Sequence, residues 1–207
     1  MSDLVLYTNP MSRGRIARWM LEEVGAPYAV EILDYASTMQ GEAYRAINPM
    51  MKVPAIVHGE RVVTECAAIC AYLADAFPDA GLAPALHDRA DYYRWLFFAA
   101  GPLEAAITDK ALGVEPTEQQ TRMAGYGTLD RTLSALEQLL AGRAYVTGDR
   151  FSAADVYVGS HLMWGMQFRG IRPRDVFEAY AERLGARDAY RRAAALDDAA
   201  MPAPQPA

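Results

Sequence analysis

Two segments of the chain carry residues suited to gripping a small charged ligand. Residues 48–54 read Asn-Pro-Met-Met-Lys-Val-Pro, and residues 64–69 read Thr-Glu-Cys-Ala-Ala-Ile. In the second segment a strand passes directly into a helix, and the free amide groups at a helix start bind anions. These amides and the carboxylate of Glu65 fit an α-amino-acid head group, whose carboxylate would meet the helix and whose amine would meet Glu65. The alternative is that Glu65 only caps the helix.

A third group of residues follows the first predicted strand. Ser12 stands at the predicted start of a helix, where serine is a preferred cap. Arg13, Arg15 and Arg18 fall within six positions, a density of positive charge that suits an anion. At helical spacing we expect Arg15 and Arg18 to share a solvated face, whereas Arg13, nearest the helix start, adds to the field there.

The elements that must position these residues change character along the chain. Apolar runs predict strands at 4–7, 28–33, 53–57 and 61–64, and helical spacing predicts helices at 12–24, 42–47 and 67–77. A strand–helix–strand start implies parallel strands, and the His-Gly-Glu turn at 58–60 implies a terminal hairpin. Helices are then predicted at 88–112, with a kink at Gly101-Pro102, and at 117–141, 152–168, 173–184 and 187–199.

We therefore expect an α/β domain at residues 1–78, a linker at 79–87, an all-α domain at 88–200 and a disordered, proline-rich tail at 201–207.

The composition excludes several classes of partner. The 207 residues carry a net charge of −6, which argues against nucleic acid and acidic membranes because binding to phosphates needs a basic face. Cys66 and Cys70 are the two cysteines. Two thiols without a nearby His form no disulfide framework and a poor zinc site, so no metal is expected. The start of the chain does not read as a signal peptide, and no apolar run approaches 18 residues. These features predict a cytoplasmic protein.

The first domain resembles the thioredoxin-like domain of cytosolic glutathione transferases. The resemblance rests on the segments at 48–54 and 64–69, and it extends over residues 3–200, with a strong second-domain match at Gly-Asp-Arg-Phe-Ser-Ala-Ala-Asp, residues 148–155. It implies that Pro54 follows a cis peptide bond and that the backbone of Val53 pairs with the cysteinyl part of glutathione. It also implies that Glu65 and Cys66 grip the γ-glutamyl end, and it adds Arg13, Gln40 and Lys52 to the binding residues. Cys66 departs from the serine that is usual in the family. Because a thiol is a weak donor, we expect glutathione to bind about five-fold more weakly than it would with serine.

The resemblance places the sulfur of glutathione at the start of the first helix, near three candidate donors. They are Ser12, Tyr7 and Asn9. Many members of the family use a serine at the position of Ser12, which makes it the first choice, whereas Tyr7 ends the first strand, as the catalytic tyrosine does in other branches. Asn9 is the third choice. The expected reaction is attack of the glutathione thiolate on a small hydrophobic electrophile. The alternatives are isomerisation, dehalogenation or peroxide reduction with the same thiolate, or a non-catalytic assembly module.

Three further expectations concern the helical domain and the assembly. Ser152 and Asp155 form a capping-box pattern and are expected to be structural. Phe98 and Trp164, in aromatic and Met-rich helical stretches, are expected to line the electrophile pocket. The resemblance also implies a homodimer.

Overall fold

The structure, a computed structural model, describes residues 3–202 in two compact units. The first unit combines the chain up to Ala80 with the chain from Ala186 on, and the second is Gly81–Gly185. The helix predicted at 187–199 therefore packs with the first unit rather than with the helices that precede it. The predicted tail at 201–207 lies outside the described residues from position 203.

A four-stranded sheet forms the centre of the first unit, in the order β2-β1-β3-β4. Its strands are β1 (Leu4–Thr8), β2 (Ala29–Ile32), β3 (Ala55–His58) and β4 (Arg61–Thr64). Strand β1 runs parallel to β2 and antiparallel to β3, which continues into β4 through a hairpin. The predicted parallel start and terminal hairpin are thus confirmed. On β1, Leu4, Leu6 and Thr8 are buried while the residues between them are partly exposed.

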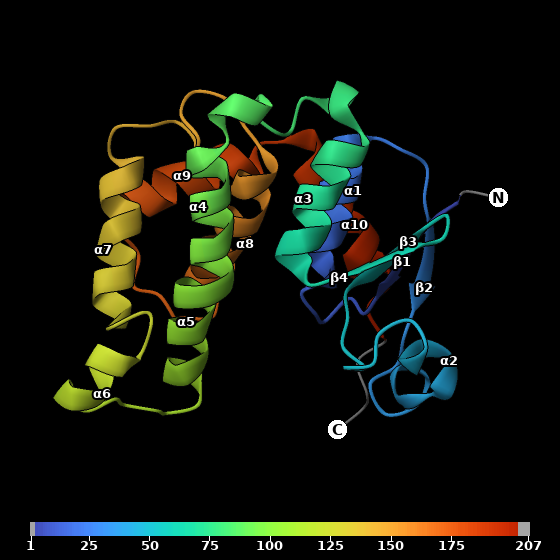
Figure 1. Cartoon of the computed structure of the whole chain (residues 1–207), viewed down its shortest axis with the longest axis horizontal. Coiled ribbons are helices and arrows are strands. Elements are labelled where there is room, and N and C mark those ends of the chain that lie inside the picture. Colours follow the sequence, from blue (N-terminus) through green and yellow to red (C-terminus); the bar gives the residue numbers. More distant parts are fainter. Residues whose placement is uncertain (1–2, 203–207) are drawn as a thin grey trace. The chain divides into compact units, whose positions relative to one another are not determined.

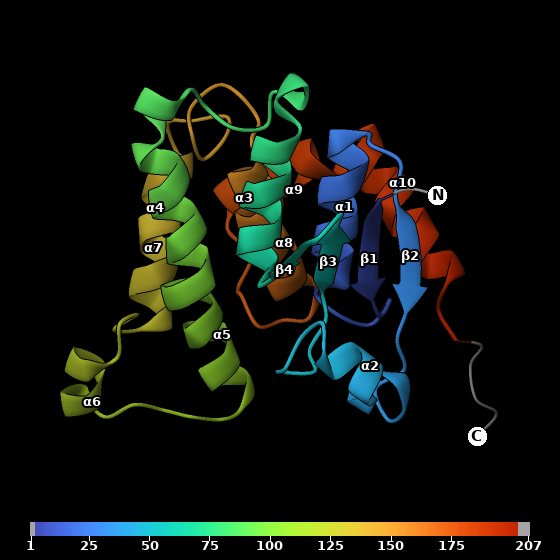
Figure 2. The same cartoon turned by 45° about the vertical axis from the view of Figure 1, so that its right-hand side comes forward.

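Helices pack on this sheet and on one another. They are α1 (Gly14–Val24), α2 (Glu42–Arg45), α3 (Cys66–Ala76) and α10 (Asp188–Ala199), with a 3₁₀ turn at Thr38–Gln40. Figure 1 and Figure 2 show α1 and α3 side by side against the sheet, with α10 alongside α1. Helix α1 is buried on all sides between residues 16 and 21, because it packs on β1 and lies between α3 and α10. It ends at Gly25, whose φ of 73° suits glycine.

The second unit is helical, as predicted. Its helices are α4 (Ala90–Phe98), α5 (Glu104–Ala111), α6 (Glu118–Met123), α7 (Leu129–Leu140), α8 (Ala153–Gln167) and α9 (Asp175–Gly185). The expected disturbance at Gly101-Pro102 is a π-helical turn, Ala99–Leu103, between α4 and α5. The single helix predicted over 117–141 is wrong: it is two helices, because Thr128 caps a new helix by accepting a hydrogen bond from the Arg131 amide (3.1 Å).

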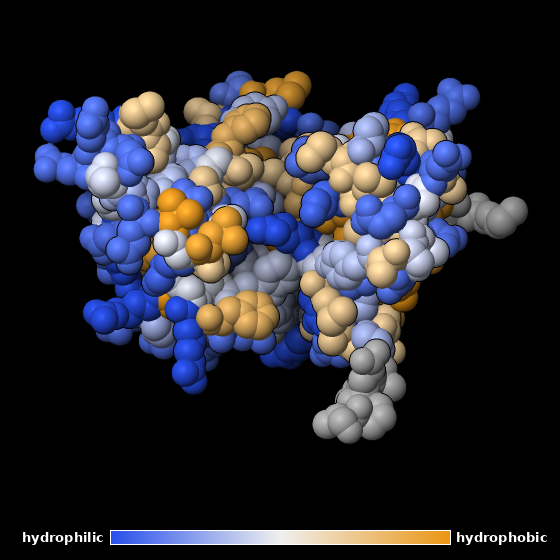
Figure 3. Space-filling view, turned by 90° about the horizontal axis from the view of Figure 1, so that it is seen from below, coloured by the Kyte–Doolittle hydropathy of each residue, from blue (hydrophilic) through white to orange (hydrophobic). Residues whose placement is uncertain are grey.

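Within residues 3–202, no helix has the length and apolar character that crossing a membrane requires. Nor do these residues contain a group of three or more His, Cys, Asp and Glu side chains arranged to hold a metal ion. Figure 3 shows one face of the molecule, where hydrophilic residues predominate and hydrophobic residues form small groups.

Candidate functional site

Strand register brings the sequence motifs to one end of the sheet. Tyr7 pairs with Ala55, and Ala55 pairs in turn with Thr64. The next residues along are Thr8, Pro54 and Glu65, so these three lie at the same edge. Helix α1 starts a few residues beyond Thr8, and α3 starts at Cys66, immediately after Glu65. The two motifs recognised in the sequence therefore meet the turn that carries Ser12.

Hydrogen bonds within the β1–α1 turn hold Ser12. Its hydroxyl donates to the Asn9 carbonyl (2.6 Å) and accepts from the Gly14 amide (2.9 Å). Helix α1 begins at Gly14, so Ser12 lies two residues before the first helical residue, and Arg13 occupies the cap position. Ser12 is partly exposed, and its hydroxyl must leave the Asn9 carbonyl in order to donate to a ligand.

The close approach of the turn to α1 explains Gly14. A Cβ atom on Gly14 would lie 1.9 Å from the hydroxyl oxygen of Thr8 and 2.9 Å from that of Ser12. Thr8 is fully buried, and its hydroxyl has no hydrogen-bond partner among the described residues. The sequence analysis did not identify Thr8 as a residue that packs against the start of α1. The signal was its inward position on β1, set by the alternation of that strand.

The other two candidate donors have different surroundings. Asn9 is buried, donates through Nδ2 to the Leu33 carbonyl (2.8 Å) and accepts from the Met11 amide at Oδ1 (2.9 Å). These bonds shape the turn. Tyr7 packs against the core cluster that includes Tyr44, with the two ring centroids 5.7 Å apart. Adjacent residues of a strand point to opposite faces, so Tyr7 faces away from the side on which Thr8 meets α1.

A contact between the two helix starts joins the halves of the site. The Cys66 thiol donates to the Arg13 carbonyl, with sulfur and oxygen 3.6 Å apart. Beside it, Glu65 has φ 62° and ψ 113° and makes no side-chain cap hydrogen bond to α3. A non-glycine residue in such a conformation costs on the order of 1–3 kcal/mol, and such residues cluster at functional sites. The simple capping role considered for Glu65 is therefore absent.

Two side-chain hydrogen bonds hold the backbone of the segment before Pro54. The Val53–Pro54 peptide bond is cis, as the resemblance implied. The Lys52 carbonyl accepts hydrogen bonds from the Tyr44 hydroxyl (2.6 Å) and from Asn48 Nδ2 (2.8 Å). Burial is the main reason that the pKa of Tyr44 is raised to about 12, so its phenol stays protonated and donating over the physiological range. Tyr44 is a supporting residue that sequence reasoning missed.

Lys52 and Gln40 are both exposed. The Gln40 side chain donates to the Tyr35 carbonyl of its own loop (3.2 Å).

Positive ends of two helices face the same region. Helices α1 and α3 each have eleven residues, and neither has an acidic residue in its first turn. A helix start carries a partial positive charge, which remains at α1 although the Gly14 amide donates to the Ser12 hydroxyl and the Arg15 amide to the Ser12 carbonyl. The edge that gathers Ser12, Cys66 and Glu65 therefore favours an anion at two adjacent points, with one carboxylate available for an ammonium group.

The arginine cluster divides differently from the prediction. Arg13 is exposed at the helix start, as expected. The expectation of a solvated face for Arg15 and Arg18 is wrong. Arg18 is 4% exposed and pairs with Asp197 of α10 (2.8 Å), and Arg15 pairs with Asp198 (2.7 Å). Both partners lie about 180 residues further along the chain, so local periodicity held no sign of them.

The remaining predicted residues belong to the second unit. Phe98 and Trp164 are half-buried on α4 and α8. Asp155 caps α8 as predicted, accepting from the Ser152 amide and hydroxyl (2.9 Å each). It also accepts from the Val146 amide (2.8 Å) and the Tyr180 hydroxyl (2.7 Å). This buried network is structural.

Comparison with known proteins places the chain among relatives of the same architecture. Residues 11–76 match the model of the glutathione S-transferase N-terminal domain, and residues 103–195 match that of the C-terminal domain. A relative from Hypomyces subiculosus, the glutathione S-transferase hmp2, is 30% identical over 192 residues, covering 84% of this chain and 87% of the relative.

Solved structures agree. A glutathione transferase from Methylococcus capsulatus superposes with a TM-score of 0.79 at 29% identity, covering 95% of this chain and 99% of that one. A sphingomonad glutathione S-transferase complexed with glutathione gives a TM-score of 0.77 at 30% identity, covering 94% and 98%. The fold is therefore a thioredoxin-like β/α domain followed by a helical domain, and the chain belongs to the glutathione S-transferase family.

Proposed function

We propose that this glutathione transferase binds glutathione at the edge where α1 and α3 begin, and activates its thiol for attack on a small hydrophobic electrophile. The observation that carries the proposal is the 3.6 Å contact between the Cys66 thiol and the Arg13 carbonyl, because it joins the two helix starts. The sphingomonad relative, whose structure contains glutathione, supports the choice of ligand.

The γ-glutamyl end of glutathione carries the head group that the sequence pattern at 64–69 favours. Its carboxylate binds the amides at the start of α3, beginning with that of Cys66, and its amine binds Glu65. The backbone of Val53 pairs with the cysteinyl residue, and the bonds from Tyr44 and Asn48 hold the preceding carbonyl in place. Arg13, Lys52 and Gln40 are exposed, and we assign them weaker, peripheral roles in binding.

Ser12 is the donor to the thiolate in this proposal. A free thiol with a pKa near 8.5 is about 3% ionised at pH 7, and lowering that pKa by ~2 units requires about 2.7 kcal/mol. A partly buried helix start supplies up to ~2 kcal/mol, and a hydrogen bond to a charged group about 1.5–3 kcal/mol. The start of α1 and the Ser12 hydroxyl together are therefore sufficient. Asn9 is buried, with both ends of its side-chain amide bonded to the backbone, whereas Ser12 is partly exposed. Tyr7 packs in a core on the other face of the sheet.

The reaction needs no covalent enzyme intermediate. The thiol proton passes to solvent, the thiolate sulfur forms a bond to the electrophilic carbon, and the leaving group departs with its electron pair. The protein stabilises the thiolate and fixes its direction of attack.

The test measures glutathione binding by calorimetry, and the pKa of the bound thiol by its thiolate absorbance. Wild-type protein should bind glutathione, lower the thiol pKa and conjugate an activated aryl halide. Ser12→Ala should raise the pKa of the bound thiol, whereas Ser12→Thr, which keeps a hydroxyl, should leave it low. An unchanged thiol pKa in Ser12→Ala removes Ser12 as the donor, and no glutathione binding at millimolar concentration removes the proposal. Product analysis over a panel of electrophiles separates conjugation from isomerisation, dehalogenation and peroxide reduction.

In this proposal Phe98 and Trp164 line the electrophile pocket, because both are half-buried aromatic side chains of the helical unit. Replacing either with alanine should raise KM for the aryl halide and leave KM for glutathione unchanged. The chain acts as a cytoplasmic homodimer, as its family membership suggests, and light scattering in solution tests the dimer.

A further inference from the structure

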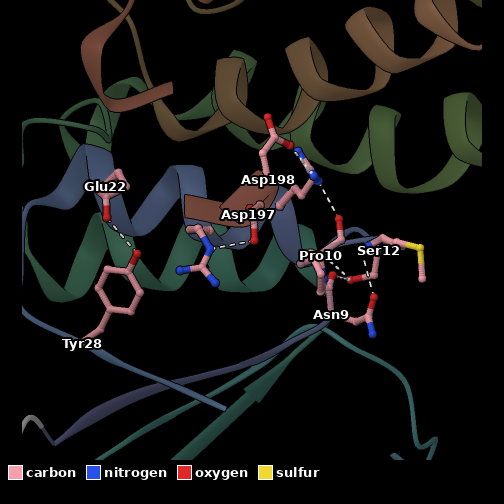
Figure 4. A network of polar contacts seen from close by, with 11 residues as sticks. Asn9, Pro10, Ser12, Glu22, Tyr28, Asp197 and Asp198 are labelled. Atoms are coloured by element: carbon pink, nitrogen blue, oxygen red, sulfur yellow. Dashed lines mark hydrogen bonds and ion pairs between the residues drawn. The ribbon is translucent and has the colours of Figure 1, made fainter. Parts of the chain in front are cut away.

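Arg15 connects the turn that carries Ser12 to the last helix of the chain. Its Nε donates to the Pro10 carbonyl (2.6 Å), and its Nη2 pairs with Asp198 on α10 (2.7 Å). Figure 4 shows Asn9, Pro10 and Ser12 grouped at the turn, with Asp197 and Asp198 on the helix that passes beside it. One guanidinium thus bonds simultaneously to the turn and to α10.

This bond holds one peptide group from two sides. The peptide between Pro10 and Met11 offers its carbonyl to Arg15 and its amide to Asn9 Oδ1 (2.9 Å). The next residue is Ser12, whose hydroxyl bonds to the Asn9 carbonyl and the Gly14 amide, groups that precede and follow this peptide in the same turn. Loss of the Arg15 contact leaves the peptide held by the Asn9 bond alone.

The neighbouring buried pair fixes the position of Asp198 even though its side chain is 67% exposed. The adjacent Asp197 is fully buried and accepts from Arg18 Nε at 2.8 Å. Because this buried pair fixes α10 along α1, the Asp198 carboxylate is held where it can orient Arg15. A second pair, Glu22 with Arg192 (3.0 Å), lies near the other end of α1, away from the turn.

We propose that Arg15 and Asp198 are positioning residues for thiol activation, acting through the Pro10 carbonyl on the orientation of Ser12. This inference rests on the proposed function, since it needs glutathione at the turn. It assigns a catalytic consequence to a carboxylate on the last helix of the chain, which contributes no residue to the proposed glutathione site.

A direct electrostatic role for Arg15 predicts the opposite sign. If Arg15 acted only as a positive charge near the thiolate, removing the Asp198 carboxylate would leave that charge less neutralised, and the thiol pKa would fall. If Arg15 acts by holding the turn, the same change loosens the hydroxyl of Ser12 and the thiol pKa rises. Lysine keeps the charge but lacks the planar fork that bonds to two acceptors. Arg15→Lys should therefore raise the thiol pKa only if Arg15 acts by holding the turn.

The experiment compares Asp198→Asn and Arg15→Lys with wild type, and Arg192→Gln serves as the matched control on the same helix. Readouts are the pKa of bound glutathione thiol, kcat/KM with an aryl halide, and the thermal midpoint. We expect both test variants to raise the thiol pKa by about half a unit and to lower kcat/KM by up to about three-fold, within the range for losing an exposed ion pair. Any effect of Arg192→Gln should be limited to a lower thermal midpoint, and the thiol pKa should be unchanged.

The outcomes separate the two levels of the argument. A lowered or unchanged thiol pKa in Asp198→Asn overturns the positioning role, as does a shift of equal size in Arg192→Gln, which would reflect general loosening of α10. Wild-type protein that binds no glutathione overturns the proposed function and this inference with it. Wild-type protein that binds glutathione with a lowered thiol pKa, alongside an unresponsive Asp198→Asn, overturns only the inference.

Discussion

Replacing Cys66 with serine should strengthen glutathione binding. Cys66 is the first residue of α3, is 8% exposed, and donates its thiol proton to the Arg13 carbonyl at 3.6 Å. A thiol is a weak donor and a hydroxyl a good one. In the proposed complex the carboxylate of the γ-glutamyl group lies at the start of α3, within reach of this side chain, so serine adds a donor where the ligand is negatively charged.

The size of the effect follows from one hydrogen bond. A typical intramolecular hydrogen bond contributes about 1 kcal/mol net, which is roughly five-fold in affinity. Against this gain stands the Arg13 carbonyl, which competes for the new hydroxyl as it now accepts from the thiol. The ligand carboxylate wins because a charged acceptor forms the stronger bond. We therefore expect the dissociation constant for glutathione to fall about five-fold.

Calorimetric titration of glutathione into wild type, Cys66→Ser and Cys66→Ala measures this directly. Alanine removes the sulfur without adding a donor, so it should bind no more tightly than wild type. The pKa of the bound thiol should be the same in all three proteins that bind, because position 66 meets the glutamyl end and not the sulfur. If Cys66→Ser binds no better than Cys66→Ala, the γ-glutamyl carboxylate does not lie at the start of α3 and the assignment of that end of the site is wrong.

Three other changes have definite expected outcomes. Gly14→Ala places a Cβ atom 1.9 Å from the buried hydroxyl oxygen of Thr8, so it should lower both the thermal midpoint and kcat/KM, and an unaffected enzyme would show that the turn shifts at no cost. Asp155→Ala removes a buried carboxylate with four hydrogen bonds, and urea unfolding should show a loss of about 3–5 kcal/mol, with the pKa of bound thiol unchanged. Burial and its bond to a glutamate raise the pKa of Tyr28 to about 12. Its contribution to stability is therefore complete below pH 10 and is lost as pH rises to about 12. The free energy of unfolding should fall less between pH 9 and pH 11 in Tyr28→Phe than in wild type. An equal fall in the two proteins would mean that ionisation of Tyr28 is not coupled to unfolding.

Local patterns predicted what depends on neighbours in sequence. The strand at 4–7 and the helix after it, the hairpin at 58–60 and the capping of α8 by Asp155 all follow from residues within a few positions of one another. The division of the helix predicted over 117–141 into two helices could also have been predicted from the sequence. A glycine at 127 with φ 65° followed by a capping threonine marks a stop and a new start.

Contacts across the length of the chain were beyond such patterns. The spacing of Arg15 and Arg18 correctly puts them on neighbouring positions of one helix, but solvent was the only partner that a local view could supply. Their true partners, Asp197 and Asp198, sit at the far end of the chain. Likewise, Tyr44 gave no sign that it supports the Lys52 carbonyl, because that contact depends on how the loop folds back over the sheet.

The two consecutive carboxylates of α10 do different work, and burial explains why. Asp197 is fully buried, and desolvation raises its pKa despite the Arg18 guanidinium beside it. Removing one partner of such a pair strands the other charge, so this contact specifies how α10 packs on α1. Asp198 is mostly exposed, and an ion pair in that setting adds at most about 1 kcal/mol to stability. Its effect on the stability of the fold is therefore small. Its role in the proposal is to orient the guanidinium of Arg15, which holds the turn before Ser12. A helix can thus be fixed by one residue and act on the site through the next.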